Sequence, residues 1–540
     1  MAFLRKEKKG ESVYLSICES YRDGDGRPQR KVLRQLGNVS DYSQEALERI
    51  GKQLIEMATG TSTEPTGMKE LCRYNYGFPL VISELLKQYG LDTLLNRLTR
   101  KHKLGFSLLQ NVQLMLCDRF NDPLSKLASF TCQTDYIGLG HSVELQHLYR
   151  TLDHLAANNQ LIQTQIYNSN RNLFNYALDV VFYDVTTFYF DSQVVEEGAL
   201  RQLGFGKDGK VGQTQILFSL LIDKNKIPIG FELFKGSQYE GHTFKNALEK
   251  LKKKYHLNRV IVVADSGMLN ADNIALFNEG DLAEGMEYIV GDRIKNMAKP
   301  TIAYLTDLAN YTTTVVKNKD NEEVPLLYCT CLYKGRTLIS TYSESRAKKD
   351  KAEREERIAK ALKMMKQPSN IEKKASRYFI KNEGDKKYTL DQKKIDQQAK
   401  FDGFKVIATN ALDITPAAAL EKYKDLYKIE QSFRSFKTYF EARPMFHWTD
   451  KRIEGHMVMC YIAFVLLCYL QNKTTYSEQT IRTLLDKMQV SKIVDNKEVI
   501  YLRSALTTPT TNLLNLLKLK PLPNVASHTT LQKYLPNFDK

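Results

Sequence analysis

Asp184 stands inside the run VVFYDVTTFYFDS, residues 180–192, which is otherwise rich in β-branched and aromatic residues. This composition predicts a strand, and both of its alternating faces are mostly apolar, as in a central strand covered on both sides. A buried carboxylate without a partner is costly. Asp184 is therefore either hydrogen-bonded at a strand end or a ligand of a metal ion.

Asp265 ends the apolar run RVIVVAD, residues 259–265, and SGMLNADNI follows it. An apolar strand that stops at an acid, then a short turn and a helix, places that acid at the carboxyl edge of a sheet. Open sheets bind their ligands at this edge. Acids at strand ends are also common for structural reasons, so Asp265 alone does not define a site.

Glu430 lies in EKYKDLYKIEQSFRSFKTYF, residues 421–440. Helical spacing places Tyr423, Leu426, Glu430, Phe433 and Lys437 on one stripe, next to an apolar stripe that faces the core. Glu430 therefore flanks the buried face of the helix. Lys437 lies two turns further on, on the same side, and could bind a phosphate. The alternative is an ordinary amphipathic helix with an acid on its flank.

Asp184, Asp265 and Glu430 together predict metal-dependent phosphoryl transfer. Two hard divalent cations need several carboxylate oxygens held on rigid elements, and a two-metal site places the ions about 3.5–4 Å apart. The chain of 540 residues has 78 Lys and Arg against 62 Asp and Glu, a net charge of +16. Such an excess favours a polyanionic partner such as DNA, although an ordinary basic protein would share it.

The elements that position these acids predict an α/β fold, a mixed sheet with flanking helices. The strand-like runs besides 180–192 are 214–223, 226–236, 259–265, 286–292 and 404–410, with a helix near 242–254. We assign this sheet domain to residues 173–294 plus 403–475. Residues 295–402, with hairpin patterns and the charged helix SRAKKDKAEREERIAKALKMMK, are predicted to be a β-rich and charged insertion.

Three further regions flank the sheet domain. Residues 1–66 form a predicted small β-rich unit lined with basic side chains, and residues 67–172 a helical region that could bind DNA, mediate dimerisation or simply pack. Residues 476–540 are predicted to be helical and then punctuated by proline.

The combined motifs resemble the DDE transposases of bacterial insertion sequences, in the group with a Tyr–Arg–Glu–Lys signature. Tyr423, Glu430 and Lys437 fit the spacing of that signature, whereas Leu426 stands at its Arg position. Arg434, one helical turn after Glu430, could replace the missing phosphate contact. The first two acids of the family lie in strands like VFYDVTTFYF and VVADSGM, and the resemblance covers most of residues 175–470.

The resemblance implies an RNase H-like catalytic domain in which Asp184, Asp265 and Glu430 bind two Mg²⁺ or Mn²⁺ ions. It further implies an enzyme that cleaves DNA at the terminal inverted repeats of its element and transfers the strand into target DNA. Tyr423 and Lys437 would hold the phosphate backbone near the cut. The family also implies a homodimer on DNA.

The stretch RPMFHWTDKRIEGH, residues 443–456, contains further candidates for DNA contact. We single out Arg443 and Trp448, because the only Trp of the chain could stack on a displaced base. The alternative places Trp448 in the core beside the catalytic helix. His456, on an apolar helix, is predicted to be a core histidine.

The composition of the chain also indicates the cellular compartment in which the protein acts. The first twelve residues lack the apolar segment of a signal peptide, and the apolar run 456–470 is short for a membrane span, so we expect a buried helix and no membrane partner. Eight Cys occur without a CxxC motif, which predicts a reducing cytoplasm rather than a disulfide framework. The resemblance adds the bacterial nucleoid as the expected site of action.

Three other functions stay open on the sequence alone. A glycoside hydrolase could use two of the acids, but the basic charge and the single Trp speak against it. A nuclease that cuts DNA without joining it shares the same two-metal chemistry. A catalytically retired DNA-binding protein is disfavoured only because all three acids are present.

Overall fold

The chain divides into two compact units in the computed structural model. One unit comprises Met1–Cys72 with Lys492–Ile500, and the other Arg73–Ser491 with Tyr501–Lys540. The structure describes residues 2–10, 12–24, 28–59, 68–139, 143–174, 178–190, 195, 199–204, 213–255, 259–268, 270–278, 285–317, 322–365, 378–382, 388–442, 445–495 and 498–535. The predicted domain boundaries stay predictions, because this division into two units does not test them.

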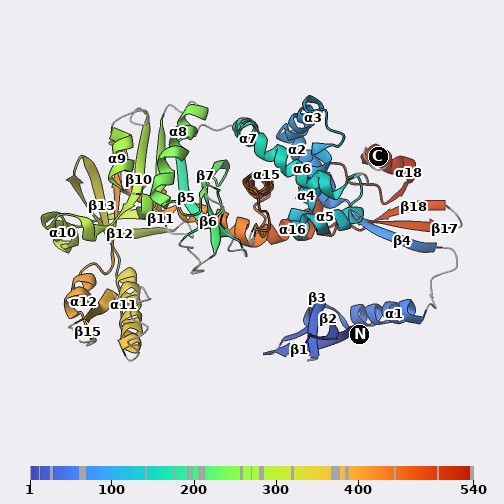
Figure 1. Ribbon diagram of the computed structural model, residues 1–540, viewed down its shortest axis with the longest axis horizontal. Helices are drawn as coiled ribbons and strands as arrows, with labels where there is room; N and C mark the ends of the chain where they lie inside the picture. Colours follow the sequence, from blue (N-terminus) through green and yellow to red (C-terminus); the bar gives the residue numbers. More distant parts are fainter. Residues whose placement is uncertain are drawn as a thin grey trace. The chain divides into compact units, whose positions relative to one another are not determined.

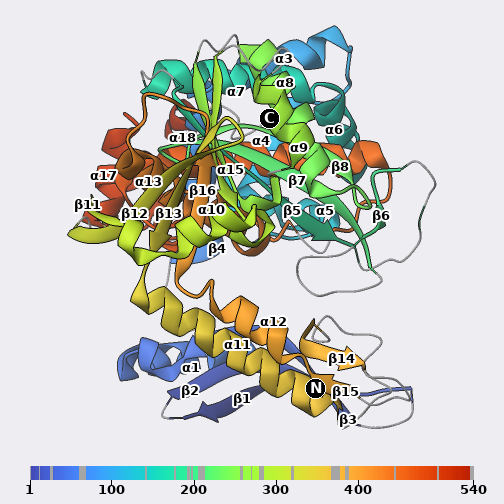
Figure 2. The ribbon, with the colours of Figure 1, turned by 90° about the vertical axis from the view of Figure 1, so that its left-hand side faces the viewer.

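The first unit contains a three-stranded antiparallel sheet of order β1-β2-β3, as predicted for a small β-rich region. The strands lie side by side in Figure 2 and are followed by a helix that the sequence patterns did not reveal. The bounds are β1 Ala2–Lys9, β2 Ser12–Arg22, β3 Pro28–Asn38 and α1 Gln44–Thr59.

The largest sheet formed by the described residues has ten strands, so the prediction of a mixed α/β fold is confirmed. Its order is β11-β12-β13-β16-β10-β9-β5-β7-β6, with β8 paired to β7. Strands β5, β9 and β10 run parallel, whereas β7 and β16 are antiparallel to their neighbours in this group. Figure 1 shows β5, β7 and β10 together, with α8 and α9 beside them.

Apart from the two-residue β6, which was not predicted, the central strands coincide with the predicted runs because each carries a series of mostly buried apolar residues. Their bounds are β5 Val180–Tyr189, β6 Gln202–Leu203, β7 Thr214–Asp223, β8 Pro228–Lys235, β9 Val260–Ala264, β10 Met286–Asp292 and β16 Phe404–Thr409. The helices of this region are α8 Thr243–Tyr255, α9 Ala271–Asn278, α13 Pro416–Lys424 and α14 Tyr427–Arg434. Every residue of β7 is buried, as expected for a strand covered on both faces.

The predicted insertion extends this sheet rather than standing apart from it. Strand β13 pairs with β16, and β12 and β11 follow outward, so hairpins from the middle of the chain form one edge of the sheet. The bounds are α10 Lys299–Thr306, β11 Thr312–Lys317, β12 Glu323–Tyr333, β13 Arg336–Tyr342, α11 Glu344–Met365, β14 Ile380–Asn382, β15 Tyr388–Leu390 and α12 Gln392–Ala399.

The helical region shares one apolar core with a face of the sheet. This core joins residues of α2 and α4 to Phe182, Phe188, Ile429 and Phe433. The helices are α2 Gly77–Gln88, α3 Leu91–Lys101, α4 Leu108–Asn121, α5 Lys126–Thr131, α6 Leu145–Ala157 and α7 Asn159–Phe174.

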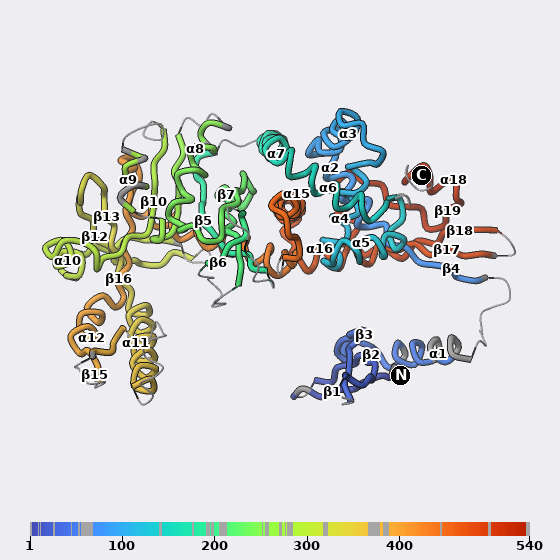
Figure 3. The backbone as a smooth tube through the Cα atoms, viewed as in Figure 1, coloured from blue at the N-terminus to red at the C-terminus, as the bar shows by residue number. Residues whose placement is uncertain are grey.

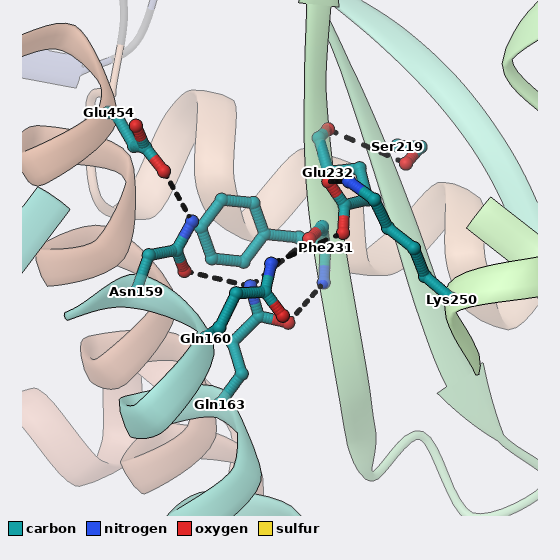
Figure 4. A network of polar contacts seen from close by, with 8 residues as sticks. All are labelled: Asn159, Gln160, Gln163, Ser219, Phe231, Glu232, Lys250 and Glu454. Atoms are coloured by element: carbon teal, nitrogen blue, oxygen red, sulfur yellow. Dashed lines mark hydrogen bonds and ion pairs between the residues drawn. The ribbon is translucent and has the colours of Figure 1, made fainter. Parts of the chain in front are cut away.

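A polar network fixes helix α7 to strand β8 (Figure 4). The Gln163 side chain accepts from the Phe231 backbone N–H and donates to the Phe231 carbonyl, both at 3.2 Å. Asn159 donates to Glu454 at 2.7 Å, which ties the same helix to α15. The backbone groups of an edge strand need partners, and Gln163 supplies them here.

The apolar run 456–470 is a buried helix, as predicted. It forms α15, Asp450–Thr474, which lies among α2, α4, α6 and α7 in Figure 3. Among the described residues, α15 is the helix long and apolar enough to cross a membrane, but 94% of its most apolar window is buried inside the protein. All eight Cys are free, in line with the absence of a predicted disulfide framework.

The C-terminal region is not helical throughout, so that part of the prediction is wrong. Short β-branched runs around residues 489–503 form strands of a sheet with order β19-β18-β17-β4. The bounds are β4 Met68–Asn75, α16 Glu478–Asp486, β17 Gln489–Asp495, β18 Glu498–Arg503, α17 Thr508–Leu516, β19 Val525–Ser527 and α18 His528–Tyr534.

Candidate active site

Asp184 and Asp265 are brought together by the pairing of two parallel strands. Tyr183 of β5 is the partner of Ala264 of β9, so the two acids are the next residues on adjacent strands. Axes of neighbouring strands lie about 4.8 Å apart. Asp184 is partly buried and Asp265 is exposed, so a ligand can reach both carboxylates.

Glu430 approaches from helix α14. Ile429 and Phe433, beside it in the helix, belong to the core that also contains Phe182 and Phe188 of β5. These β5 residues lie on the same strand face as Asp184, because side chains alternate along a strand. Packing of α14 on this face therefore carries Glu430, which is exposed, toward the acids of the strands.

The three acids line one cavity of about 690 Å³. Two cations, Lys405 and Lys424, and a further acid, Glu421, line it too. Val316 of β11 and Val324 of β12 line it as well, so the edge hairpin contributes apolar side chains. The three acids thus share one cavity, and their role as metal ligands stays a prediction.

Tyr423 lies beside Asp265. Its side chain is 6% exposed, and its hydroxyl donates a hydrogen bond of 3.4 Å to Oδ1 of Asp265. Burial and the negative charge of Asp265 raise the pKa of Tyr423. A Cβ at Gly291 would lie only 2.5 Å from this hydroxyl, so the approach of Tyr423 requires glycine at that position.

Lys405 adds a positive charge to this group. Its ammonium nitrogen lies 4.4 Å from the centre of the Tyr423 ring, a cation–π contact. The pKa of Lys405 is lowered by partial withdrawal of the ammonium group from water and by repulsion from Arg346, whereas Asp265 and Glu430 act in the opposite direction. Lys405 is the second residue of strand β16, and no sequence motif marked it as a site residue.

The predicted stripe on the catalytic helix is only partly realised. Tyr423, Leu426 and Glu430 line the cavity, but the residues that line it do not include Arg434 or Lys437. The chain forms two helices separated at Asp425–Leu426 rather than one, and a π-helical turn, Ser435–Tyr439, follows α14. A π turn widens the helix, which rotates the residues after it out of α-helical register.

The remaining candidates lie away from the cavity lining. Trp448 is 55% exposed with the Arg201 guanidinium 4.6 Å from its ring, so the interpretation of Trp448 as a core residue is wrong. Arg443 lies outside the described residues. His456 is buried as predicted, with Nε2 3.6 Å from Sγ of Cys460, although no hydrogen-bond partner for its Nδ1 is found in the described part of the chain.

The cavity offers oxygen ligands of the type that hard divalent cations prefer. No group of three His, Cys, Asp or Glu side chains within the described ranges is arranged tightly enough to hold a metal ion. Carboxylates that face one another repel in the absence of a cation. The donor set thus fits Mg²⁺ or Mn²⁺ in chemistry, with the three acids around a shared cavity rather than in contact.

Comparisons with known proteins give a match to a family model and matches to solved structures. Residues 4–64 match the model of the N-terminal domain of IS1634 family transposases, which supports a transposase. A structure of the piggyBac transposase synaptic complex with hairpin DNA matches 88% of this chain and 87% of its own, at 11% identity and a TM-score of 0.36. Comparison with curated proteins gives no match.

Proposed function

We propose that the protein is a DDE transposase, which cleaves DNA at the ends of an insertion sequence and joins the freed strand to target DNA. The observation that carries the proposal is that Asp184, Asp265 and Glu430, far apart in the chain, line a single cavity. The match of residues 4–64 to a transposase domain supports the class of protein independently of these acids.

Two divalent ions, Mg²⁺ or Mn²⁺, are the proposed cofactors, with Asp184, Asp265 and Glu430 as their ligands. When bound, such ions activate the attacking oxygen and stabilise the leaving one. Two residues of the chain support these acids. Tyr423 orients Asp265 through its hydrogen bond, and Lys405 adds positive charge next to the acids. The parallel β5, β9 and β10 with antiparallel β7 are compatible with an RNase H-like domain.

DNA is the proposed substrate because the chain carries a net charge of +16. A cavity with cationic Lys405 and Lys424 at its wall suits a phosphate that approaches the acids. Arg434, Lys437 and Trp448, which do not line the cavity, remain proposed DNA contacts, as does Arg443. We further propose that two copies act together on DNA at the bacterial nucleoid, as cutting of two ends requires.

The test is cleavage of a DNA fragment that carries the element ends, with and without Mg²⁺. Asp184→Asn, Asp265→Asn and Glu430→Gln should each lower cleavage by at least about a thousandfold, equivalent to about 4 kcal/mol, while DNA binding persists. Glu421→Gln is the matched control, because Glu421 lines the same cavity but is not one of the three acids. Normal cleavage by any one of the three variants would overturn the role of that acid.

The same assay separates the proposal from its nearest alternative. A nuclease without joining activity would cut the fragment in a metal-dependent way and leave the 3′-hydroxyl ends unjoined. A supercoiled target plasmid added to the reaction should acquire the labelled end if strand transfer occurs. Cleavage without a joined product would restrict the function to DNA cutting.

A further inference from the structure

The N-terminal sheet has two faces of different character. Cross-strand partners lie on the same face of an antiparallel sheet. Leu4 pairs with Ile17, and Ile17 pairs with Arg34, so these three residues share one face. The adjacent row on this face joins Glu19 to Lys31.

We call this the basic face. Alternation along each strand adds Lys6 and Lys8 to it, so it carries Lys6, Lys8, Lys31 and Arg34 against the single acid Glu19. All four cations are exposed. Within the described residues none of the four forms an ion pair, so their charges are available to a partner.

The opposite face differs in burial and in pairing. It holds Ser16 and Cys18, which are 7% and 0% exposed. Its Arg5 is paired with Glu7 at 3.3 Å, and both lie on β1. This face is therefore partly covered and partly neutralised, whereas the basic face is open.

We propose that the basic face docks on double-stranded DNA. Four cations without an ion pair among the described residues, on a surface about 10 Å across, the width of three strands, complement the phosphates that border a groove. Leu4 and Tyr21 on the same face are 59% and 51% exposed, and they offer apolar contacts to base edges. Strands that enter a DNA groove are an established mode of binding.

The proposal rests on the proposed function only for the identity of the polyanion. Nothing in it depends on the acids of the cavity, because the first unit contains none of them. Binding can therefore be measured with EDTA present, where no metal-dependent cleavage occurs. Loss of cleavage chemistry and loss of docking are thus distinguishable.

The test compares two double variants of the full chain that remove the same charge. Lys31→Gln with Arg34→Gln alters the basic face, and Arg5→Gln with Arg30→Gln alters the opposite one. Affinity for a duplex of thirty base pairs is measured by fluorescence anisotropy over a range of KCl. Each lost phosphate contact lowers the slope of log affinity against log salt by about 0.9, so the basic-face variant should lose about 2 and the control almost nothing.

A variant that is expected to bind DNA more tightly provides a further test, because misfolding could explain a loss of affinity but not a gain. Glu19→Lys adds a cation to the basic face and should tighten binding several-fold and steepen the slope by about 1. Equal slopes for the two double variants, or no gain with Glu19→Lys, would overturn the proposal. A face-specific loss on phosphatidylserine vesicles but not on DNA would also overturn it and identify an anionic membrane as the partner.

Discussion

Tyr423 donates a hydrogen bond from its hydroxyl to Oδ1 of Asp265 across 3.4 Å, although the two residues are 158 positions apart in the chain. The hydroxyl lies within the buried part of the site, so it acts on the acid rather than on bulk solvent. This contact joins the helix that precedes Glu430 to the strand end that carries the second acid.

The first prediction concerns this hydroxyl. Tyr423→Phe should lower the rate of DNA cleavage by about tenfold, because Asp265 loses the group that orients it, while DNA affinity stays the same. The measurement is single-turnover cleavage at saturating Mg²⁺. Tyr427→Phe is the control, since Tyr427 also lines the cavity but makes no hydrogen bond to an acid within the described part of the chain. Equal rates for both variants would remove the positioning role of Tyr423.

The second prediction concerns Gly291 of β10. An added methyl group would lie 2.5 Å from the Tyr423 hydroxyl and 3.1 Å from the backbone nitrogen of Ser266. Gly291→Ala should therefore displace Tyr423 and the segment after Asp265, and lower cleavage by about ten- to a hundredfold. The double variant Gly291→Ala with Tyr423→Phe should be little worse than either single variant, since the hydroxyl is then absent. Fully additive effects would contradict this relationship.

The third prediction is a pH dependence of DNA cleavage that Lys405 sets. An ordinary lysine has a pKa of about 10.4. The pKa of Lys405 is lowered, so its ammonium group loses the proton at a lower pH than an ordinary lysine does. Cleavage should therefore decline as the pH rises toward 10, because the positive charge beside Asp265 and Glu430 disappears. Lys405→Arg keeps its charge at all of these pH values and should abolish the decline. Lys424→Arg, the same change in the same cavity, should leave the profile as in the wild type.

The fourth prediction concerns a buried ammonium group in the helical region. Lys126 is 3% exposed, no hydrogen-bond partner for its Nζ is found in the described residues, and burial lowers its pKa to about 7. Below pH 7 the lysine is charged in both the folded and the unfolded protein. Burial of the charged ammonium group then lowers the free energy of unfolding by its full amount. Between pH 7 and about 10.4 the folded protein releases the proton first, and the cost disappears as the pH rises.

Lys126→Met should accordingly raise the thermal midpoint at pH 6, with a gain in the free energy of unfolding of at most about 5 kcal/mol. Attraction by Asp118 tempers this gain, whereas repulsion from Arg119 adds to the cost that the variant removes. The difference between variant and wild type should shrink toward pH 10. A constant difference from pH 6 to 10 would show that the ammonium charge is not the cause.

Local patterns were sufficient to find the acids and their strands. The runs that contain Asp184 and Asp265 are mostly apolar, and burial on both faces follows directly from that composition. The acids interrupt or end these runs, which made them visible as candidates. Their proximity across β5 and β9 required no long-range information beyond parallel pairing.

Other parts of the site depend on contacts that sequence spacing does not encode. The break at Asp425–Leu426 and the π turn after Arg434 separate Lys437 from the cavity, although a regular helix would align them. Lys405 and the apolar side chain of Val316 enter the site only because the hairpins of the insertion pair with β16. Trp448 lies exposed beside Arg201, a contact between residues distant in the chain.

The most direct test of the central claim is a measurement of Mn²⁺ binding to the protein, in which the electron paramagnetic resonance signal of free Mn²⁺ reports how much of the ion is unbound. The wild-type chain with duplex DNA should bind Mn²⁺ tightly, and Asp184→Asn, Asp265→Asn and Glu430→Gln should each weaken that binding at least tenfold. Glu421→Gln should bind as the wild type does. Unchanged Mn²⁺ affinity in all three acid variants would contradict a shared metal site at this cavity.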